Sequence, residues 1–151
     1  MESLGFDEIK LRLERFCAYQ ERCSNDVIIK MQSLGVSEKP LEIKLLDALK
    51  KDRFLNDKRF VEAFIEGRVN IKKWGVNKIR AGLFQRFISS PLIEEGLMGL
   101  DRAKYKKNLL SLAAKKQTSL PEKETDFIKK TKVLRFLASK GYTSEDCAFL
   151  F

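Results

Sequence analysis

The sequence repeats one pattern of apolar residues three times, and this repetition constrains the fold more than any other feature. The stretches SNDVIIKMQSLGVSEKPLEIKLL, VNKIRAGLFQRFISSPLIEEGL and TKVLRFLASKGYTSEDCAFLF superimpose at shifts of 52 and then 54 residues. Their apolar positions coincide without gaps, as in Val27, Ile79 and Val133, and in Met31, Leu83 and Leu137. A regular repeat of this length is typical of stacked supersecondary units.

Each copy of the pattern predicts a unit of three helices. Helix-forming residues dominate, and no stretch keeps the period-two alternation of a strand for long. Another amphipathic stretch precedes each aligned pair, for example the one that carries Ile9, Leu13 and Cys17. We therefore expect an all-α protein with three-helix repeats over residues 1–52, 53–100 and 101–151. Because units of this size hide their apolar faces poorly alone, they should stack into an elongated, curved array.

Each copy should turn at the same place. A hydroxyl residue, Ser37, Ser89 or Thr143, stands where it could cap the amides of a new helix. Pro40 and Pro91 fall in the first turn that follows, where a missing N–H is harmless. Thr143 and the Asp three residues later approximate a capping box.

Three further local features are expected. Asn56 or Asp57 should cap the first helix of the second unit, and Gly75 should separate that helix from the next. The polar stretch QTSLPEKETD predicts a longer, mobile connection in the third unit. Trp74 could stack on a nucleobase, but packing over the adjacent helix junction is favoured, and Tyr19 and Tyr105 fit core stripes.

The composition argues against an enzyme. The chain has no histidine, which removes the commonest general base and metal ligand. Its three cysteines show no CxxC spacing and are expected to be small buried apolar residues. No phosphate-binding or nucleophile motif occurs. We therefore expect no catalytic residue, no cofactor and no metal.

The net charge of +9 is unevenly distributed. Residues 53–107 hold thirteen bases against six acids, whereas residues 1–52 hold nine against ten. No Asp or Glu occurs between Arg68 and Ile93. With Ile79, Leu83 and Phe87 turned inward, the bases should face water or a partner. The candidate binding residues are Arg68, Lys72, Lys73, Lys78, Arg80, Arg86, Lys104, Lys106, Lys107, Lys132 and Arg135.

The charge pattern leaves the class of partner open. A basic field favours polyanions, so one reading is a direct DNA-binding protein built from helix-turn-helix-like units. Another is a helical scaffold that docks a second protein through an apolar face containing an exposed Ile29. A solvated lysine-rich surface is the third. The chain has no apolar stretch long enough to span a bilayer and no secretory signal, so we expect a cytoplasmic protein, a monomer without membrane contact.

Specific stretches of the middle of the chain resemble one known family. RFLNDKRFVEAFIEGRV, KKWGVNKIRAGLFQRFIS and LIEEGL, within residues 53–97, resemble the signature of the RecX family of bacterial recombination regulators. The resemblance extends more loosely over nearly the whole chain and is weakest in the third unit. Phe87 stands where the family pattern usually has a glycine, and the last helix is short.

The resemblance implies a function as well as a fold. Members of this family are built from tandem three-helix units and bind the RecA recombinase, chiefly along the groove of its filament on single-stranded DNA. They restrain ATP hydrolysis, strand exchange and the RecA-assisted cleavage of the SOS repressor in recombination and DNA repair. Carried onto this chain, Arg68, Lys72, Lys73, Lys78 and Arg80 would face the filament's acidic surfaces or its DNA.

Overall fold

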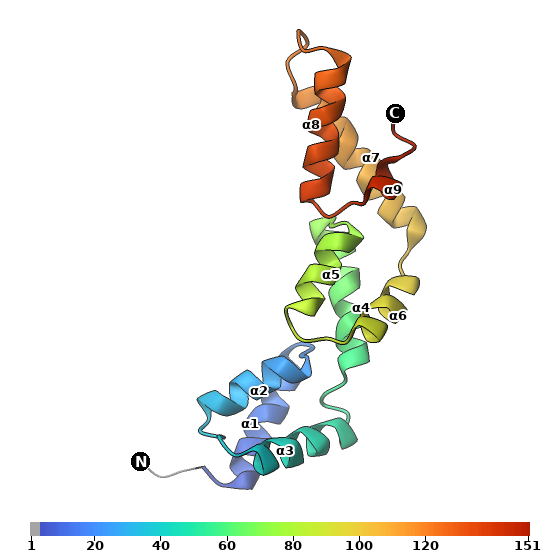
Figure 1. Ribbon diagram of the computed structural model, residues 1–151. Coiled ribbons are helices and arrows are strands. Elements are labelled where there is room, and N and C mark those ends of the chain that lie inside the picture. Colours follow the sequence, from blue (N-terminus) through green and yellow to red (C-terminus); the bar gives the residue numbers. More distant parts are fainter. Residues whose placement is uncertain (1–3) are drawn as a thin grey trace.

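The computed structural model describes residues 4–151 as an elongated, curved stack of helices (Figure 1). The first unit consists of α1 (Phe6–Tyr19), α2 (Ser24–Ser33) and α3 (Lys39–Lys51). The second consists of α4 (Asp57–Gly67), continued by the π-helical segment η1 (Arg68–Lys72), and of α5 (Val76–Phe84) and α6 (Ser90–Met98). The third consists of α7 (Arg102–Ser119), α8 (Asp126–Ser139) and α9 (Ser144–Cys147). No strand occurs over this range, so the predicted all-α repeat fold is confirmed.

The middle helix of every unit ends in the same backbone geometry. The positions that align under the repeat are Gly35, Phe87 and Gly141, and their φ angles are 90°, 59° and 99°. The next residue in each unit donates its N–H to the carbonyl five residues earlier, as Ile88 does to Leu83 at 3.3 Å. This is the bond that closes a helix whose cap is left-handed. Two units use glycine for the left-handed position, and the second uses phenylalanine.

The prediction that Phe87 turns inward with Ile79 and Leu83 is wrong. Ile79 and Leu83 are fully buried, but the side chain of Phe87 is 82% exposed. The helical spacing on which the prediction depended no longer applies there, because α5 ends at Phe84 and the backbone turns away. The expectation that Tyr19 fits a core stripe is also wrong. Tyr19 is 82% exposed, and α1 ends at this residue.

Hydroxyl capping is confirmed in one of the three turns. Thr143 Oγ1 accepts from the N–H of Asp146 at 2.9 Å, and the Asp146 carboxylate accepts in return, which completes the capping box. Ser89 holds the N-cap position without a side-chain bond, and α3 begins after Glu38, so Ser37 lies outside the cap. Both of these helices carry proline in the first turn, so one fewer amide there needs an acceptor.

Two other expectations are resolved by local hydrogen bonds. Asn56 caps α4 by accepting from the backbone N–H of Arg59 at 3.0 Å, as expected. The polar connection in the third unit is shorter than predicted, because α7 continues to Ser119. The hydroxyls of Thr118 and Ser119 donate to carbonyls three residues earlier, which accommodates polar residues in the last helical turn.

The second and third units share one core. Residues of α4 to α9 form a single buried cluster, in which Val133 and Leu137 of α8 lie with Ile79 and Leu83 of α5. The first unit has its own core, built around Leu13, Met31, Leu45 and Leu49. The cysteines are all free and buried, as predicted, and Cys23 belongs to the core of the later units.

The joints between units therefore differ in character. Between the second and third units, the hydroxyl of Tyr105 accepts from the N–H of Val76 at 3.0 Å and donates to Asp146 at 2.6 Å. The Tyr142 hydroxyl donates to the carbonyl of Lys73 at 2.8 Å. Burial raises the pKa of both phenols, that of Tyr142 to about 12, so both remain neutral donors.

Between the first and second units, side-chain hydrogen bonds accompany the burial of Cys23. The backbone N–H and the hydroxyl of Ser24 both donate to Asp57, at 2.7 Å each. Arg59 Nε donates to Glu21 at 2.6 Å. These contacts fix the first unit against the start of α4 without merging the two cores.

Candidate partner-binding surface

Alternating cations and aromatic rings form a continuous array on the second unit, which we call the cation–π ladder. Its members, in spatial order, are Arg86, Phe64, Arg68, Trp74 and Lys78. The guanidinium carbons of Arg86 and Arg68 lie 5.0 Å and 4.1 Å from the Phe64 ring centroid. Arg68 also lies 5.1 Å from the Trp74 ring, and the Lys78 ammonium lies 4.7 Å from it. The two rings meet edge to face at 6.4 Å.

Local backbone features bring these side chains together. Arg68 begins the π-helical segment, whose extra residue per turn shifts the chain ahead of Trp74. The side-chain amide of the buried Asn108 donates to the carbonyl of Val69 at 2.8 Å, so this carbonyl of the π-helical segment has a hydrogen-bond donor. Gly82 lets α5 approach, since a Cβ there would lie 2.9 Å from the Phe64 ring. Trp74 thus packs over the helix junction, as expected.

Two arginines of the ladder and one beside it lack carboxylate partners among the described residues. Within residues 4–151, no Asp or Glu oxygen lies within 4.0 Å of the charged nitrogens of Arg22, Arg68 or Arg86. Burial, and then the charge of Arg86, lower the pKa of Arg68. The Nε of Arg68 is buried and has no hydrogen-bond acceptor in the part of the chain that the structure describes. An anionic group supplied by a partner would therefore stabilise the charged guanidiniums of these arginines.

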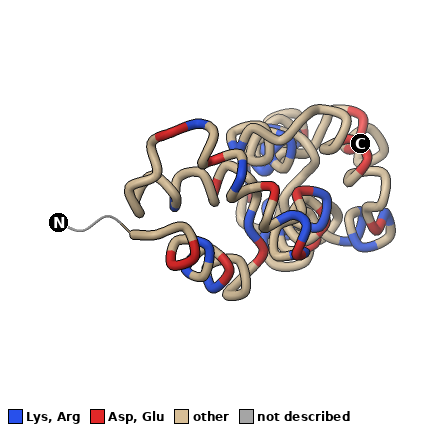
Figure 2. Tube along the Cα trace, turned by 90° about the horizontal axis from the view of Figure 1, so that it is seen from below, with Lys and Arg blue, Asp and Glu red and all other residues tan. Residues whose placement is uncertain are grey.

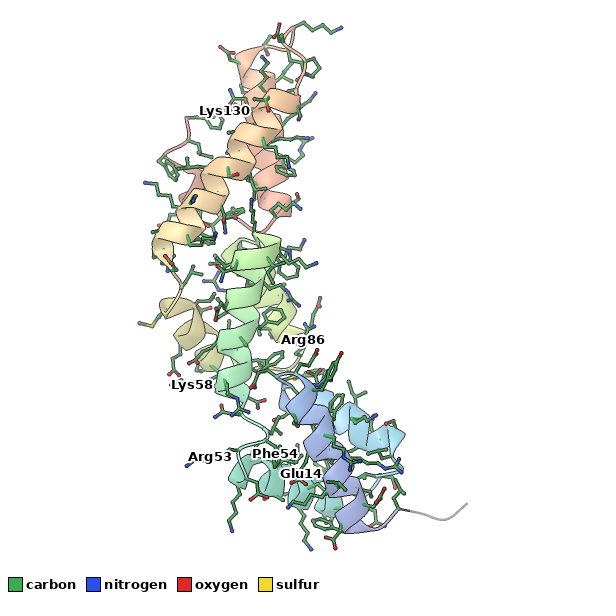
Figure 3. All side chains as sticks on the ribbon, turned by 180° about the vertical axis from the view of Figure 1, so that it is seen from behind. Glu14, Arg53, Phe54, Lys58, Arg86 and Lys130 are labelled. Carbon is green, nitrogen blue, oxygen red and sulfur yellow. The ribbon has the colours of Figure 1, made fainter. Side chains whose placement is uncertain are left out.

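These arginines border a hollow at the boundary of the first two units. The hollow has a volume of about 440 Å³. Arg22 reaches it from the first unit, with its guanidinium 3.8 Å from the Phe16 ring. Figure 3 shows Arg86 beside the first unit, where its Nη1 donates to the carbonyl of Gly82 at 2.9 Å. Glu21 and Asp26 also line this hollow, but each is engaged in its own contact.

The remaining predicted binding residues do not join this cluster. Arg80 is paired with Glu94, at 2.6 Å and 3.3 Å, which raises the pKa of Arg80 and lowers that of Glu94. Lys132 is paired with Glu124. Lys106 lies 4.9 Å from the Phe149 ring. The others lie exposed or half-buried around the same units: Lys72, Lys73, Lys104, Lys107 and Arg135. Figure 2 shows Lys and Arg interspersed with Asp and Glu around the trace.

Two exposed phenylalanines flank Arg86 and were not identified from the sequence. Phe84 is 72% exposed and Phe87 is 82% exposed. We call residues 84–87, with the sequence FQRF, the aromatic corner. The aligned segments of the other units read QSLG and ASKG and contain no aromatic residue. This comparison within the chain is the signal that could have revealed the corner.

A second hollow on the same unit has the opposite charge. It lies between α4, α6 and the start of α7 and has a volume of about 560 Å³. Val61, Ile65 and Leu100 contribute apolar surface there. Its acidic residues are Glu62, Glu66, Glu95 and Asp101, and one of these, Glu95, is paired with Lys58 at 3.1 Å. The basic cluster and the acidic hollow give the middle unit two chemically different surfaces.

The described chain, residues 4–151, contains no cluster of three or more Cys, Asp and Glu side chains placed to hold a metal ion. None of its described helices is both long and apolar enough to cross a bilayer.

Comparison with known proteins identifies the family. Residues 56–97 match the family model of the second three-helix domain of RecX, and residues 105–149 match that of the third. The chain is 38% identical over 136 residues to the regulatory protein RecX of Clostridium tetani, covering 87% of this chain and 60% of the relative. It is 32% identical over 130 residues to that of Chlorobium phaeobacteroides, covering 86% and 82%.

Solved structures support the same assignment of the fold. The crystal structure of RecX from Lactobacillus salivarius superimposes with a TM-score of 0.85 at 19% identity, over 93% of this chain and 90% of that one. A crystal structure of another regulatory protein RecX gives 0.80 at 18% identity, over 94% and 72%. The chain spans about half the length of the Clostridium botulinum relatives that it matches at 40% and 42% identity. The family models and the sequence relatives together show that the chain belongs to the RecX family of regulatory proteins.

Proposed function

We propose that this chain is a cytoplasmic regulator, without catalytic activity of its own, that binds the RecA recombinase and its filament on single-stranded DNA. It restrains ATP hydrolysis, strand exchange and RecA-assisted cleavage of the SOS repressor, and so acts in recombination, DNA repair and the SOS response. The family assignment supports this role, as does the elongated stack of units. The observation that carries the proposal is the cluster of Arg22, Arg68 and Arg86, which have no carboxylate partner among residues 4–151.

The geometry supports binding rather than chemistry. Cations on aromatic faces keep their charge while their positions are fixed, which suits recognition of an acidic surface. An elongated protein that contacts successive protomers would oppose the subunit motion that ATP hydrolysis requires, because separate contacts on one chain reinforce one another. In this proposal Lys72, Lys73 and Lys78 act with Arg68 and Arg86, whereas Arg80 and Lys132 contribute less because each already has a carboxylate partner.

The proposal is tested by titrating the protein into DNA-dependent ATP hydrolysis by its cognate recombinase. Changing Lys72, Lys73 and Lys78 together to Glu should weaken inhibition at least about tenfold, since three attractive contacts become repulsive. A matched control changes Lys50, Lys51 and Lys123 to Glu, which alters the net charge equally on exposed residues elsewhere. Equal inhibition by both variants, with normal helical circular dichroism, would refute this surface.

A second candidate function is direct binding of DNA, which the surplus of basic residues between Arg68 and Ile93 favours. Salt distinguishes the two. A direct binder takes naked oligonucleotide with an affinity that falls steeply as salt is added, whereas the proposed regulator requires the recombinase to be present.

A further inference from the structure

The aromatic corner combines exposure with a backbone conformation that phenylalanine disfavours. Phe84 and Phe87 are 72% and 82% exposed to solvent. Phe87 has a φ of 59°, in the left-handed region, where a side chain costs about 1–2 kcal/mol relative to the right-handed region. The side chain contributes little burial in return. Strained residues that gain little locally are found preferentially at functional sites.

The repeat makes this position informative. Gly35 and Gly141 occupy the same left-handed position in the neighbouring units, at φ 90° and 99°. The same turn can therefore be made with glycine, and the fold itself does not require an aromatic side chain. An exposed aromatic pair on either side of an arginine has the composition of a protein interface hot spot.

Charge around the corner indicates the chemistry of the partner. Arg86 lies between the two phenylalanines in the sequence and, together with Arg22 and Arg68, borders the hollow between the first two units. Among residues 4–151, none of these three arginines has a carboxylate oxygen within 4.0 Å of its charged nitrogens. Glu21 and Asp26 line the same hollow. The negative charges of Glu21 and Asp26 repel a nucleic-acid backbone, which would bring several phosphates into the hollow. A single partner carboxylate can still approach one of the guanidiniums. The observations thus favour a protein surface over a nucleic-acid backbone.

We propose that the aromatic corner inserts Phe84 and Phe87 into an apolar pocket of the partner recombinase, with partner carboxylates at the pocket's rim meeting Arg86 and its neighbours. This inference rests on the proposed function, because that function supplies the partner. It adds that the main specific contact is an apolar anchor at the end of α5, in addition to the surrounding lysines.

The test measures binding of the fluorescently labelled protein to recombinase filaments assembled on oligothymidylate with a slowly hydrolysed ATP analogue. Combining Phe84→Ser with Phe87→Gly should weaken binding at least about 30-fold, the effect expected when a hot-spot anchor is removed. The matched control is Phe127→Ser on α8, which removes an aromatic side chain that is 77% exposed far along the chain. It should change affinity less than about twofold. Arg86→Glu should also weaken binding, and Arg86→Lys should retain part of it.

The outcomes separate this inference from the proposed function. Failure of the unaltered protein to bind filaments would overturn both. Normal binding by the unaltered protein and by the double variant, each with a normal melting temperature, would overturn the aromatic corner and leave the regulator proposal standing. If the double variant instead lost affinity equally for naked oligothymidylate, the corner would be a nucleic-acid surface and the inference of a protein pocket would be wrong.

Discussion

Replacing Phe87 by glycine and by alanine should give an order of stability opposite to that found at an ordinary helical site. Both replacements remove the same aromatic ring, which buries little surface because the residue is 82% exposed. They differ in the backbone, because alanine keeps a Cβ in a left-handed conformation at φ 59° and glycine does not. The comparison therefore isolates the strain at this turn.

The expected magnitude follows from two opposing effects. Relief of the left-handed strain favours glycine by about 1–2 kcal/mol. The greater freedom of glycine in the unfolded chain favours alanine by about 0.5–1 kcal/mol. Phe87→Gly should thus exceed Phe87→Ala in free energy of unfolding by about 0.5–1 kcal/mol, which corresponds to roughly 1–4 °C in melting temperature for a chain of this size.

Ala81, an exposed residue in the middle of α5, provides the control position. Ala81→Gly should lower the free energy of unfolding by about 1 kcal/mol, since glycine disfavours an ordinary helix interior. Urea unfolding followed by fluorescence suits both sites, because the chain's single tryptophan, Trp74, lies in the cation–π ladder of the same unit. Phe87→Ala proving as stable as Phe87→Gly would refute the claim that this turn stores strain.

Two further predictions concern the joint between the second and third units. Gly141→Ala should lower the free energy of unfolding by about 2–5 kcal/mol, because the added Cβ would lie 2.5 Å from Lys78 Cβ and 2.6 Å from its backbone nitrogen. Gly35→Ala, where the added Cβ meets open space, should cost only about 1 kcal/mol. Equal losses in urea unfolding would contradict the close approach. Tyr105→Phe should lower the free energy of unfolding by about 1–3 kcal/mol in the same assay, because it leaves the buried N–H of Val76 without its acceptor. An unchanged urea midpoint would show that this hydroxyl does not stabilise the joint.

The repeat predicted the core well because burial on a helix depends on local spacing. Val27, Ile79 and Val133, aligned from the sequence alone, are each fully buried. The same reasoning failed at Phe87, since helical spacing carries no information beyond the point where the backbone leaves the helix. The alignment with Gly35 and Gly141 did mark that point. A positional comparison between the repeats was therefore more informative there than the apolar pattern.

The candidate surface was harder to predict than the fold. The acid-free stretch contains Arg68, Lys78 and Arg86, but sequence spacing could not place them on the rings of Phe64 and Trp74. That arrangement depends on the π-helical segment and on the close approach of α5. Ion pairs such as that of Arg80 with Glu94 join residues 14 positions apart, so a count of bases overstated how many remain free for a partner.

The unequal joints bear on how the aromatic corner could act. Arg68, Arg86 and the corner belong to a pair of units that share one core, whereas Arg22 comes from a unit with its own core, which is joined to them by polar contacts through Asp57 and Arg59. A partner carboxylate that meets Arg22 and Arg86 together must therefore bridge two separately packed cores. Part of its binding free energy then goes into fixing their relative orientation. Weakening the polar joint should consequently reduce affinity for the filament even though none of the contacts at the corner has been removed.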